Sequence, residues 1–151
     1  MKQSTFIMFK PDTIERKLEN EIIQIFIDNG YKIERSKEFI VDESLILKHY
    51  EDVIKAVNKD YFKNAVLNAF LGKKVIAYEI SKDSLDVVHE VRELIGATDP
   101  SKALPTCIRG KYCMDSIESA MSEKRMVKNL IHASDSLESV EREIKLWFDH
   151  Q

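Results

Sequence analysis

The order of elements along the chain predicts an α+β sandwich, in which helices cover a four-stranded antiparallel sheet. Two observations support this class. Strand-like apolar runs alternate with amphipathic helical patterns, and no internal repeat, low-complexity stretch or change of composition interrupts them. The length of 151 residues and the hydrophobic content of 44% also suit one compact domain with its own core. We therefore expect a single domain over residues 1–151.

Hydrophobic periodicity predicts each element. In chain order we expect a strand over 5–9, a helix over 19–29, a strand over 31–41, helices over 42–57 and 60–71, a strand over 74–80, a helix over 83–95, a loop over 96–109, a last strand and a helix over 136–148. Pro11 ends the first strand because proline has no amide donor. Gly30 is suited to end a helix in the left-handed conformation, and Asp42 is a candidate N-cap. A bulge is expected within residues 35–38 of the second strand.

Composition and charge exclude several classes of protein. The formal net charge is only −3, so no basic excess indicates nucleic acid as the main partner. The two cysteines, Cys107 and Cys113, are too few for a disulfide framework and lack the companions of a zinc site. Reduced thiols favour a cytoplasmic protein. No apolar run approaches the roughly 20 residues that span a membrane, and we expect neither a leader peptide nor a membrane partner.

One histidine stands out as a candidate for chemistry. His132 lies between an apolar pair and small polar residues in the run Asn129-Leu130-Ile131-His132-Ala133-Ser134-Asp135. Imidazole is largely neutral and nucleophilic at pH 7, so it needs orienting more than activating. The helix over 136–148 could return Glu143 towards this ring. Taken alone, such a histidine is more often a hydrogen-bonded structural residue. The run over residues 129–135 by itself leaves that alternative open.

Cationic side chains are the second requirement if the histidine handles phosphate, because they neutralise the equatorial oxygens of the transferred group. The candidates are Lys10, Arg92 and Arg109. Lys10 closes the first strand beside a proline, and Arg109 follows the long loop over 96–109. The chain lacks the glycine-rich phosphate loops of P-loop proteins and of protein kinases.

Three separated motifs together resemble the nucleoside diphosphate kinase family. They are Met8-Phe9-Lys10-Pro11-Asp12, Ile108-Arg109-Gly110 and the run over residues 129–135, which is similar to the family's Asn-x-x-His-Gly/Ala-Ser-Asp signature. The resemblance extends over nearly the whole chain and implies a ferredoxin-like core. It also implies transfer of the γ-phosphate of ATP or another nucleoside triphosphate to a nucleoside diphosphate, in a ping-pong exchange through a phosphohistidine.

The resemblance assigns roles by position. His132 would carry the phosphoryl group, Glu143 would hydrogen-bond the other ring nitrogen, and Ser134 would support that carboxylate. The catalytic set is completed by Lys10. The nucleotide-binding positions are Lys10, Arg92, Thr98 and Arg109 for phosphate, Lys10 and Asn129 for the sugar, Tyr50 near phosphate and histidine, and Tyr61 for stacking on the base, with Phe62 as the alternative one residue on. Tyr50 could equally be a residue of an amphipathic helix with a solvated hydroxyl.

Cofactor and assembly follow from the same resemblance. Mg²⁺ is expected to arrive on the nucleotide phosphates, since no carboxylate cage is visible in the sequence. A homo-oligomer is expected, either a hexamer or an assembly of dimers. Residues 111–128 form a segment longer than in most family members, with the composition of an added helix, and residues 51–60 form a smaller lengthening. Two alternatives remain: a non-catalytic nucleotide-binding or scaffold member of the same fold, and a purely structural interaction module.

Overall fold

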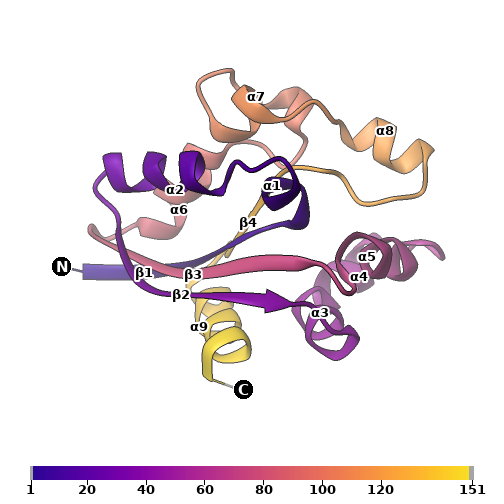
Figure 1. The fold of residues 1–151 in the computed structure, drawn as a ribbon, viewed down its shortest axis with the longest axis horizontal. Coiled ribbons are helices and arrows are strands. Elements are labelled where there is room, and N and C mark those ends of the chain that lie inside the picture. Colours follow the sequence, from indigo (N-terminus) through magenta and orange to yellow (C-terminus); the bar gives the residue numbers. More distant parts are fainter. Residues whose placement is uncertain (1, 150–151) are drawn as a thin grey trace.

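The computed structural model describes residues 2–149, which form a four-stranded antiparallel sheet with helices on both faces (Figure 1). The strands are β1 (Lys2–Phe9), β2 (Lys32–Ile40), β3 (Lys74–Asp83) and β4 (Ile131–Ala133). Their order in the sheet is β2-β3-β1-β4, and all three pairings are antiparallel. The predicted α+β, ferredoxin-like sandwich is confirmed.

The helices fill the connections between the strands. They are α1 (Pro11–Glu15), α2 (Glu19–Asp28), α3 (Glu43–His49), α4 (Glu51–Val57), α5 (Phe62–Phe70), α6 (Val87–Ile95), α7 (Ile108–Tyr112), α8 (Ile117–Ser122) and α9 (Leu137–Ile144), with a 3₁₀ turn at Pro100–Lys102 and a π-helical turn at Lys145–Asp149. None of the described helices has both the length and the apolar character needed to cross a membrane.

Strand β1 divides the core into two layers, because alternate side chains of a strand point to opposite faces. Ile7 and Phe9 pack with α2 and α6, whereas Phe6 and Met8 pack with α3, α5 and Trp147. Figure 1 shows α2 and α6 on one side of the sheet and α3 and α9 on the other. All five side chains are fully buried. The short strand β4 therefore has one face towards each layer.

Several predicted boundaries need correction. The expected helix over 42–57 is two helices, α3 and α4, separated at Tyr50, although Asp42 does cap α3 by accepting from the Leu45 amide at 2.8 Å. Strand β3 continues beyond the predicted end at residue 80 to Asp83, which was the predicted start of a helix. The reason is that Ser81 to Asp83 pair with residues 2–4 of β1. The irregularity in β2 lies between Ile33 and Arg35, just before the expected position.

Candidate active site

The backbone at Leu130 determines how the chain enters β4. Its φ is 71°, a left-handed conformation that costs a non-glycine residue about 1–2 kcal/mol. Three hydrogen bonds hold it there: the Leu130 amide donates to Asp12 Oδ2 at 3.0 Å, and its carbonyl accepts from Thr13 Oγ1 at 2.6 Å and from the Lys10 amide at 2.9 Å. The lysine motif thus positions β4, two residues before His132.

His132 sits at the centre of β4 and is tied to helix α9. Ile131 and Ala133 are buried in the α2 and α6 layer, so His132 points to the opposite face of the sheet. Its Nε2 lies 2.8 Å from Glu143 Oε1, and Ser134 Oγ donates to the same oxygen at 2.7 Å. An ionised carboxylate only accepts hydrogen bonds, so the proton of the neutral ring resides on Nε2. Nδ1 keeps a free lone pair.

Glu143 stays ionised although it is buried. Burial alone raises the pKa of its carboxyl, but the positive charge that His132 carries when protonated and the hydrogen bonds from His132 and Ser134 outweigh this effect, so the pKa lies well below its ordinary value. Arg142 also donates to the second carboxylate oxygen, Oε2, at 3.2 Å. Ser136 fixes the start of α9 by accepting from the Ser139 amide at 3.0 Å. The sequence identified Glu143 and Ser134, but the contribution of Arg142 was missed.

A second histidine lies behind the first and was also missed. His49, at the end of α3, is buried, and its Nδ1 accepts from Trp147 Nε1 at 2.9 Å. Burial lowers the pKa of His49 to about 3, so the ring is neutral with its proton on Nε2. The rings of His49 and His132 are 4.4 Å apart and nearly perpendicular. The only signal in the sequence was a histidine on the apolar face of a helical segment.

One group of described side chains has metal-ligand chemistry but does not suit a resident ion. Ligand atoms of His49, His132 and Glu143 lie within 4.8 Å of one another. The Trp147 hydrogen bond leaves a proton on His49 Nε2, and Glu143 already serves His132. This nitrogen-rich group also differs from the oxygen sites that Mg²⁺ prefers. These three residues therefore do not offer the oxygen ligands of a magnesium site.

Lys10 brings a buried positive charge to the cavity. Its Nζ donates to Asn129 Oδ1 at 2.8 Å and to the Val127 carbonyl at 3.1 Å. Burial, together with the nearby Arg109, lowers the pKa of Lys10 to about 8. Asn129 in turn donates from Nδ2 to the Thr98 carbonyl at 3.0 Å. Three of the predicted nucleotide-binding residues are therefore joined in one chain of contacts.

Arg109 is held by backbone carbonyls from two segments. Its guanidinium donates to the carbonyls of Gly96 at 3.1 Å, Asn129 at 3.2 Å and Ile131 at 2.5 Å. Burial lowers the pKa of Arg109 to about 10, so its side chain stays charged at neutral pH. Arg92, on α6, donates to the Ala133 carbonyl at 3.0 Å. Both arginines thus hold the two ends of β4 while lining the cavity.

Gly110 allows Arg109 to reach this position. A Cβ at Gly110 would lie 2.0 Å from the Leu104 carbonyl oxygen, so any side chain there would displace backbone. The close approach brings the loop over 96–109 onto α7. This explains the glycine of the Arg109-Gly110 motif in purely steric terms.

The predicted site residues meet around one cavity of about 410 Å³. Those that line it are Lys10, Tyr50, Tyr61, Arg92, Thr98, Arg109, Asn129, His132 and Glu143. Ser134 is not among them, since it is buried behind Glu143. Tyr61 and Phe62 both line the cavity, so the geometry leaves the choice of stacking ring open. Tyr50 is buried, which excludes the solvated alternative, and burial raises the pKa of its hydroxyl.

This arrangement suits phosphoryl transfer. A nucleophilic nitrogen lies beside a carboxylate that can stabilise positive charge on the same ring. Lys10, Arg92 and Arg109 are among the cationic side chains that line the cavity, and cations of this kind compensate the oxygens of a transferred phosphoryl group.

Known proteins similar to this chain share one description. A family model for nucleoside diphosphate kinase matches residues 3–151. Nucleoside diphosphate kinase 3 of Mus musculus is 38% identical over 98% of this chain and 78% of its own length. The nucleoside diphosphate kinase of a Synechocystis strain is 37% identical over 97% of this chain and 87% of its own length.

Solved structures agree with the sequence relatives. The nucleoside diphosphate kinase of Borrelia burgdorferi, a transition-state mimic with bound vanadate and ADP, has a TM-score of 0.90 and 32% identity, covering 97% of this chain and 87% of its own. The NDP kinase of Pyrobaculum aerophilum has a TM-score of 0.85 and 28% identity, covering 98% and 96%. From these matches and the fold, the chain belongs to the nucleoside diphosphate kinase family, whose members are phosphotransferases.

Proposed function

We propose that His132 is the phosphoryl carrier of this nucleoside diphosphate kinase. The observation that carries the proposal is the 2.8 Å contact between His132 Nε2 and Glu143, which leaves Nδ1 as the nucleophile. In the first half-reaction, Nδ1 forms a bond to the γ-phosphorus while the bond from that phosphorus to the β-γ bridging oxygen breaks. The nucleoside diphosphate leaves. In the second, a terminal oxygen of another diphosphate attacks the same phosphorus and the N–P bond breaks.

Glu143 stabilises the ring in both half-reactions. When Nδ1 bonds to phosphorus and Nε2 keeps its proton, the imidazole acquires positive charge, which the adjacent carboxylate compensates. Ser134 keeps the carboxylate oriented through its 2.7 Å hydrogen bond. Neither step requires Glu143 to accept the proton.

The cationic side chains bind the phosphates in this proposal. Lys10, Arg92 and Arg109, with the Thr98 hydroxyl, contact the phosphate oxygens, and Tyr50 lies close to the transferred group. Lys10 and Asn129 also contact the sugar hydroxyls. The two side chains can reach the same sugar because they lie side by side, 2.8 Å apart. Tyr61, or Phe62 beside it, stacks on the base.

Magnesium, assembly and compartment complete the proposal. Mg²⁺ bound to the phosphates would neutralise charge that the three cations leave uncompensated. Family membership supports a homo-oligomer, either a hexamer or an assembly of dimers. The free thiols of Cys107 and Cys113 fit a cytoplasmic location. An accessible cavity beside a partly exposed His132 argues against a non-catalytic scaffold with a closed cleft.

Substitution of the carrier tests the proposal. His132→Ala should abolish phosphate exchange between ATP and GDP while the protein stays folded. His89→Ala is the matched control, since His89 is an exposed histidine on α6 outside this cavity, and it should retain full exchange. Exchange at the normal rate by folded His132→Ala protein would refute the covalent mechanism.

A further inference from the structure

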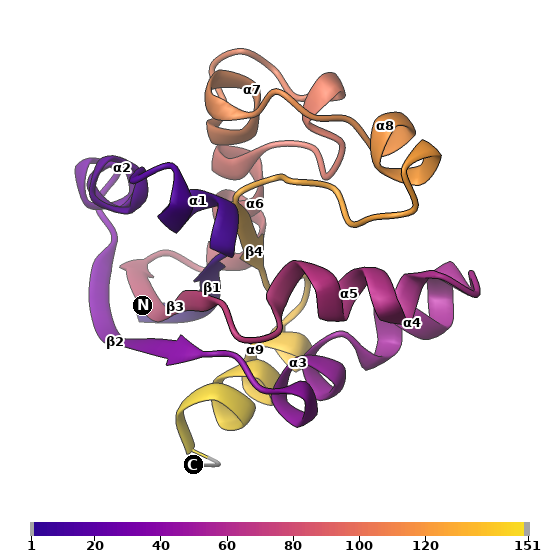
Figure 2. The same cartoon turned by 45° about the vertical axis from the view of Figure 1, so that its right-hand side comes forward.

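His49 takes no part in the mechanism above, although it lies against the reacting histidine. It is the last residue of α3, a helix that packs beside α9 and the π-helical turn on one side of the sheet (Figure 2). His49 is only 2% exposed, and its ring centre lies 4.4 Å from that of His132 at an interplanar angle of 78°. The two rings therefore meet edge to face.

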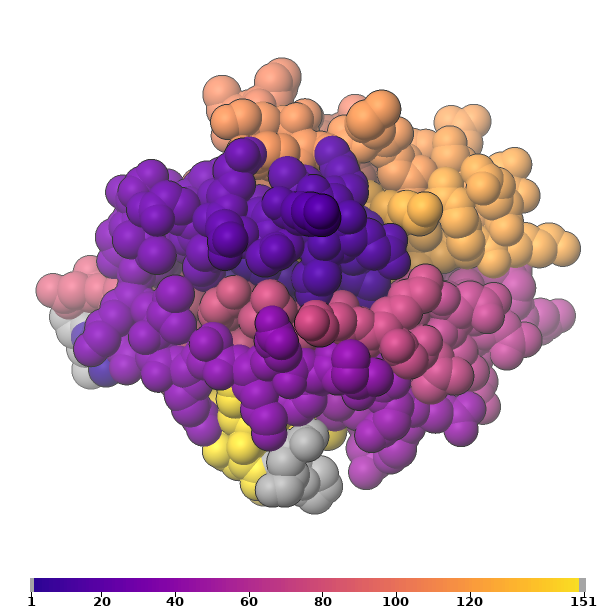
Figure 3. All heavy atoms as spheres, in the orientation of Figure 1, coloured from indigo at the N-terminus to yellow at the C-terminus, as the bar shows by residue number. Residues whose placement is uncertain are grey.

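Aromatic side chains cover the rest of the His49 ring. The ring centres of Phe6, Tyr50 and Trp147 lie 6.2, 4.6 and 5.4 Å from it. In the space-filling view, the yellow residues of α9 and the turn after it emerge only below the purple residues of β2 and α3 (Figure 3). The polar atoms of His49 thus have few neighbours with which they can pair.

Trp147 determines which nitrogen of His49 carries the proton. Its Nε1 donates to His49 Nδ1 at 2.9 Å, so Nδ1 presents its lone pair. Burial keeps the ring neutral, because it lowers the pKa of His49 to about 3. The single N–H of the ring is therefore at Nε2, and this nitrogen can only donate.

This Nε2 donor has no acceptor within residues 2–149. Four buried side-chain atoms of that range lack a hydrogen-bond partner, and the other three belong to Thr5, Glu19 and Glu90. Those three residues lie outside the nucleotide cavity, whereas His49 lines it. An unpaired buried donor is destabilising and therefore uncommon, so its presence beside a reacting group calls for an explanation.

The carboxylate near His49 is already occupied. Glu143 accepts at Oε1 from His132 and Ser134, and at Oε2 from Arg142. Ring nitrogens of the two histidines and an oxygen of Glu143 lie within 4.8 Å of one another, but no hydrogen bond joins His49 to the other two residues. The donor is thus close to the reacting group without being used there.

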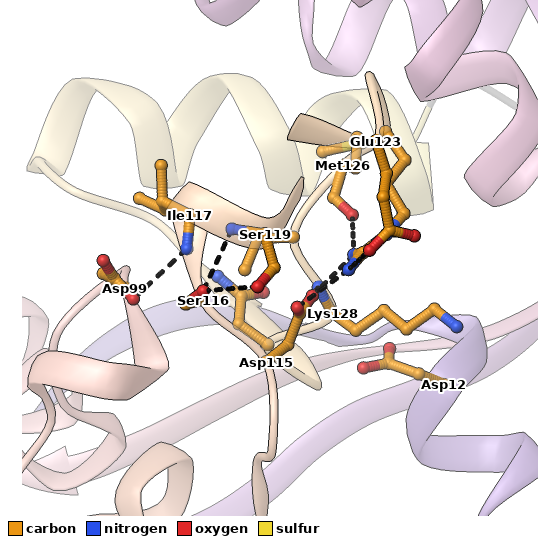
Figure 4. A network of polar contacts seen from close by, with 12 residues as sticks. Asp12, Asp99, Asp115, Ser116, Ile117, Ser119, Glu123, Met126 and Lys128 are labelled. Atoms are coloured by element: carbon orange, nitrogen blue, oxygen red, sulfur yellow. Dashed lines mark hydrogen bonds and ion pairs between the residues drawn. The ribbon is translucent and has the colours of Figure 1, made fainter. Parts of the chain in front are cut away.

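Another part of the cavity wall shows the contrast. Arg125 lines the cavity, and its guanidinium donates to Asp115 at 2.6 and 2.9 Å, while the Lys128 amide donates to the same carboxylate at 2.8 Å (Figure 4). The polar groups of that wall are paired within the protein. Among the described residues that line the cavity, only His49 holds a buried side-chain donor without an acceptor.

We propose that His49 is a further catalytic residue, which donates from Nε2 to an oxygen of the phosphoryl group as that group bonds to His132 Nδ1. The proposal rests on the proposed function, because it requires a phosphoryl group on His132. A phosphoryl oxygen is a charged, strong acceptor, and this contact forms as the N–P bond forms, so it favours the transition state. The proton stays on His49 throughout. Trp147 is a positioning residue that keeps this proton on Nε2.

Single-turnover kinetics test the donor. Leucine occupies similar space without a donor, so His49→Leu should slow phosphohistidine formation at saturating ATP and magnesium about 10- to 100-fold. Glutamine can place an amide nitrogen near the position of Nε2, so His49→Gln should react within about fivefold of the normal rate. ADP lacks the transferred group, and its affinity in calorimetry should change less than about twofold in both variants. His89→Leu, at an exposed histidine on α6 outside this cavity, is the matched control and should change neither quantity.

Trp147→Phe separates the donor from a purely structural role. It removes the same 2.9 Å hydrogen bond but keeps the His49 ring, whose proton can then occupy either nitrogen, so the rate should fall less than about threefold. A spectroscopic measurement on the unmodified protein needs no variant to fold. In ¹⁵N-labelled protein, the proton resonance of His49 Nε2 should move downfield when His132 is phosphorylated, because the donor gains a charged acceptor.

Three results would overturn the proposal. They are a His49→Leu rate within about twofold of normal, equal losses in His49→Leu, His49→Gln and Trp147→Phe, or a His49 Nε2 resonance that phosphorylation leaves unmoved. Equal losses would mean that the ring only supports the fold. Each of these results leaves phosphohistidine formation in the unmodified protein intact. Failure of the proposed function would instead appear as absent phosphohistidine in the unmodified protein, and the role of His49 would fail with it.

Discussion

Replacing Glu143 by glutamine isolates the electrostatic part of the proposed mechanism. The substitution keeps the size of the side chain and one carbonyl oxygen for Ser134 but removes the charge that lies 2.8 Å from His132 Nε2. A hydrogen bond to a charged group contributes about 1–2 kcal/mol more than one between neutral groups. This difference corresponds to a fall of about 5- to 30-fold in the rate of phosphohistidine formation. A glutamine that turns its amide towards Nε2 would add to the loss by placing the ring proton on Nδ1.

Rapid-quench measurement of protein-bound phosphate after mixing with ATP and magnesium gives this rate. Glu141→Gln is the matched control, because Glu141 is an exposed carboxylate on the same helix α9. It should react at the normal rate. A folded Glu143→Gln protein that forms phosphohistidine within about twofold of the normal rate would refute a charge-stabilising role for this carboxylate.

Three further predictions concern stability and binding. Trp147→Phe removes the only hydrogen bond described for buried His49 Nδ1, and the unfolding free energy should fall by about 1–3 kcal/mol in denaturant titrations; a fall below about 0.5 kcal/mol would contradict this. In the free protein, Lys10 loses its proton as pH rises through its lowered pKa of about 8, so the affinity for ADP should fall above this pH. Binding of ADP above this pH should also take up protons, which calorimetry in two buffers measures. Lys10→Arg should lack this pH dependence, and its absence from the unmodified protein would refute the assignment. Gly110→Ala places a Cβ 2.0 Å from the Leu104 carbonyl oxygen and should cost about 1–3 kcal/mol in the same titrations, whereas unchanged stability would show that the loop yields freely.

The convergence of the proposed catalytic residues could be predicted because they lie in recognisable runs. Residues 8–12, 108–110 and 129–135 are short patterns that each carry a reactive or charged side chain, and all three reach the cavity. Helical periodicity was enough to suggest the approach of Glu143 to His132, whereas the role of Ser134 came from the resemblance to the family.

The supporting contacts could not be predicted because they depend on tertiary structure. His49 and Trp147 are 98 positions apart, and neither lies in a pattern that indicates the other. The left-handed backbone of Leu130 is stabilised by Asp12 and Thr13 from the other end of the chain, and no local propensity of leucine predicts it. Long-range pairing overrides local preference in both cases.

The errors in the fold have the same origin. Residues 81–83 belong to β3 because residues 2–4 of β1 pair with them, and this pairing was invisible to a search for helical spacing. Helix α1 was missed because its five residues are too few to establish a period. By contrast, a helix is present within residues 111–128, as expected, at α8.

The intact mass of the protein tests the central claim most directly. After brief exposure to ATP and magnesium and removal of free nucleotide, the mass should rise by one phosphoryl group. Addition of GDP should return the mass to its original value while GTP appears, and His132→Ala should show no increase. A folded protein that converts GDP to GTP without ever gaining this mass, or a His132→Ala protein that gains it and passes it to GDP, would contradict transfer through His132.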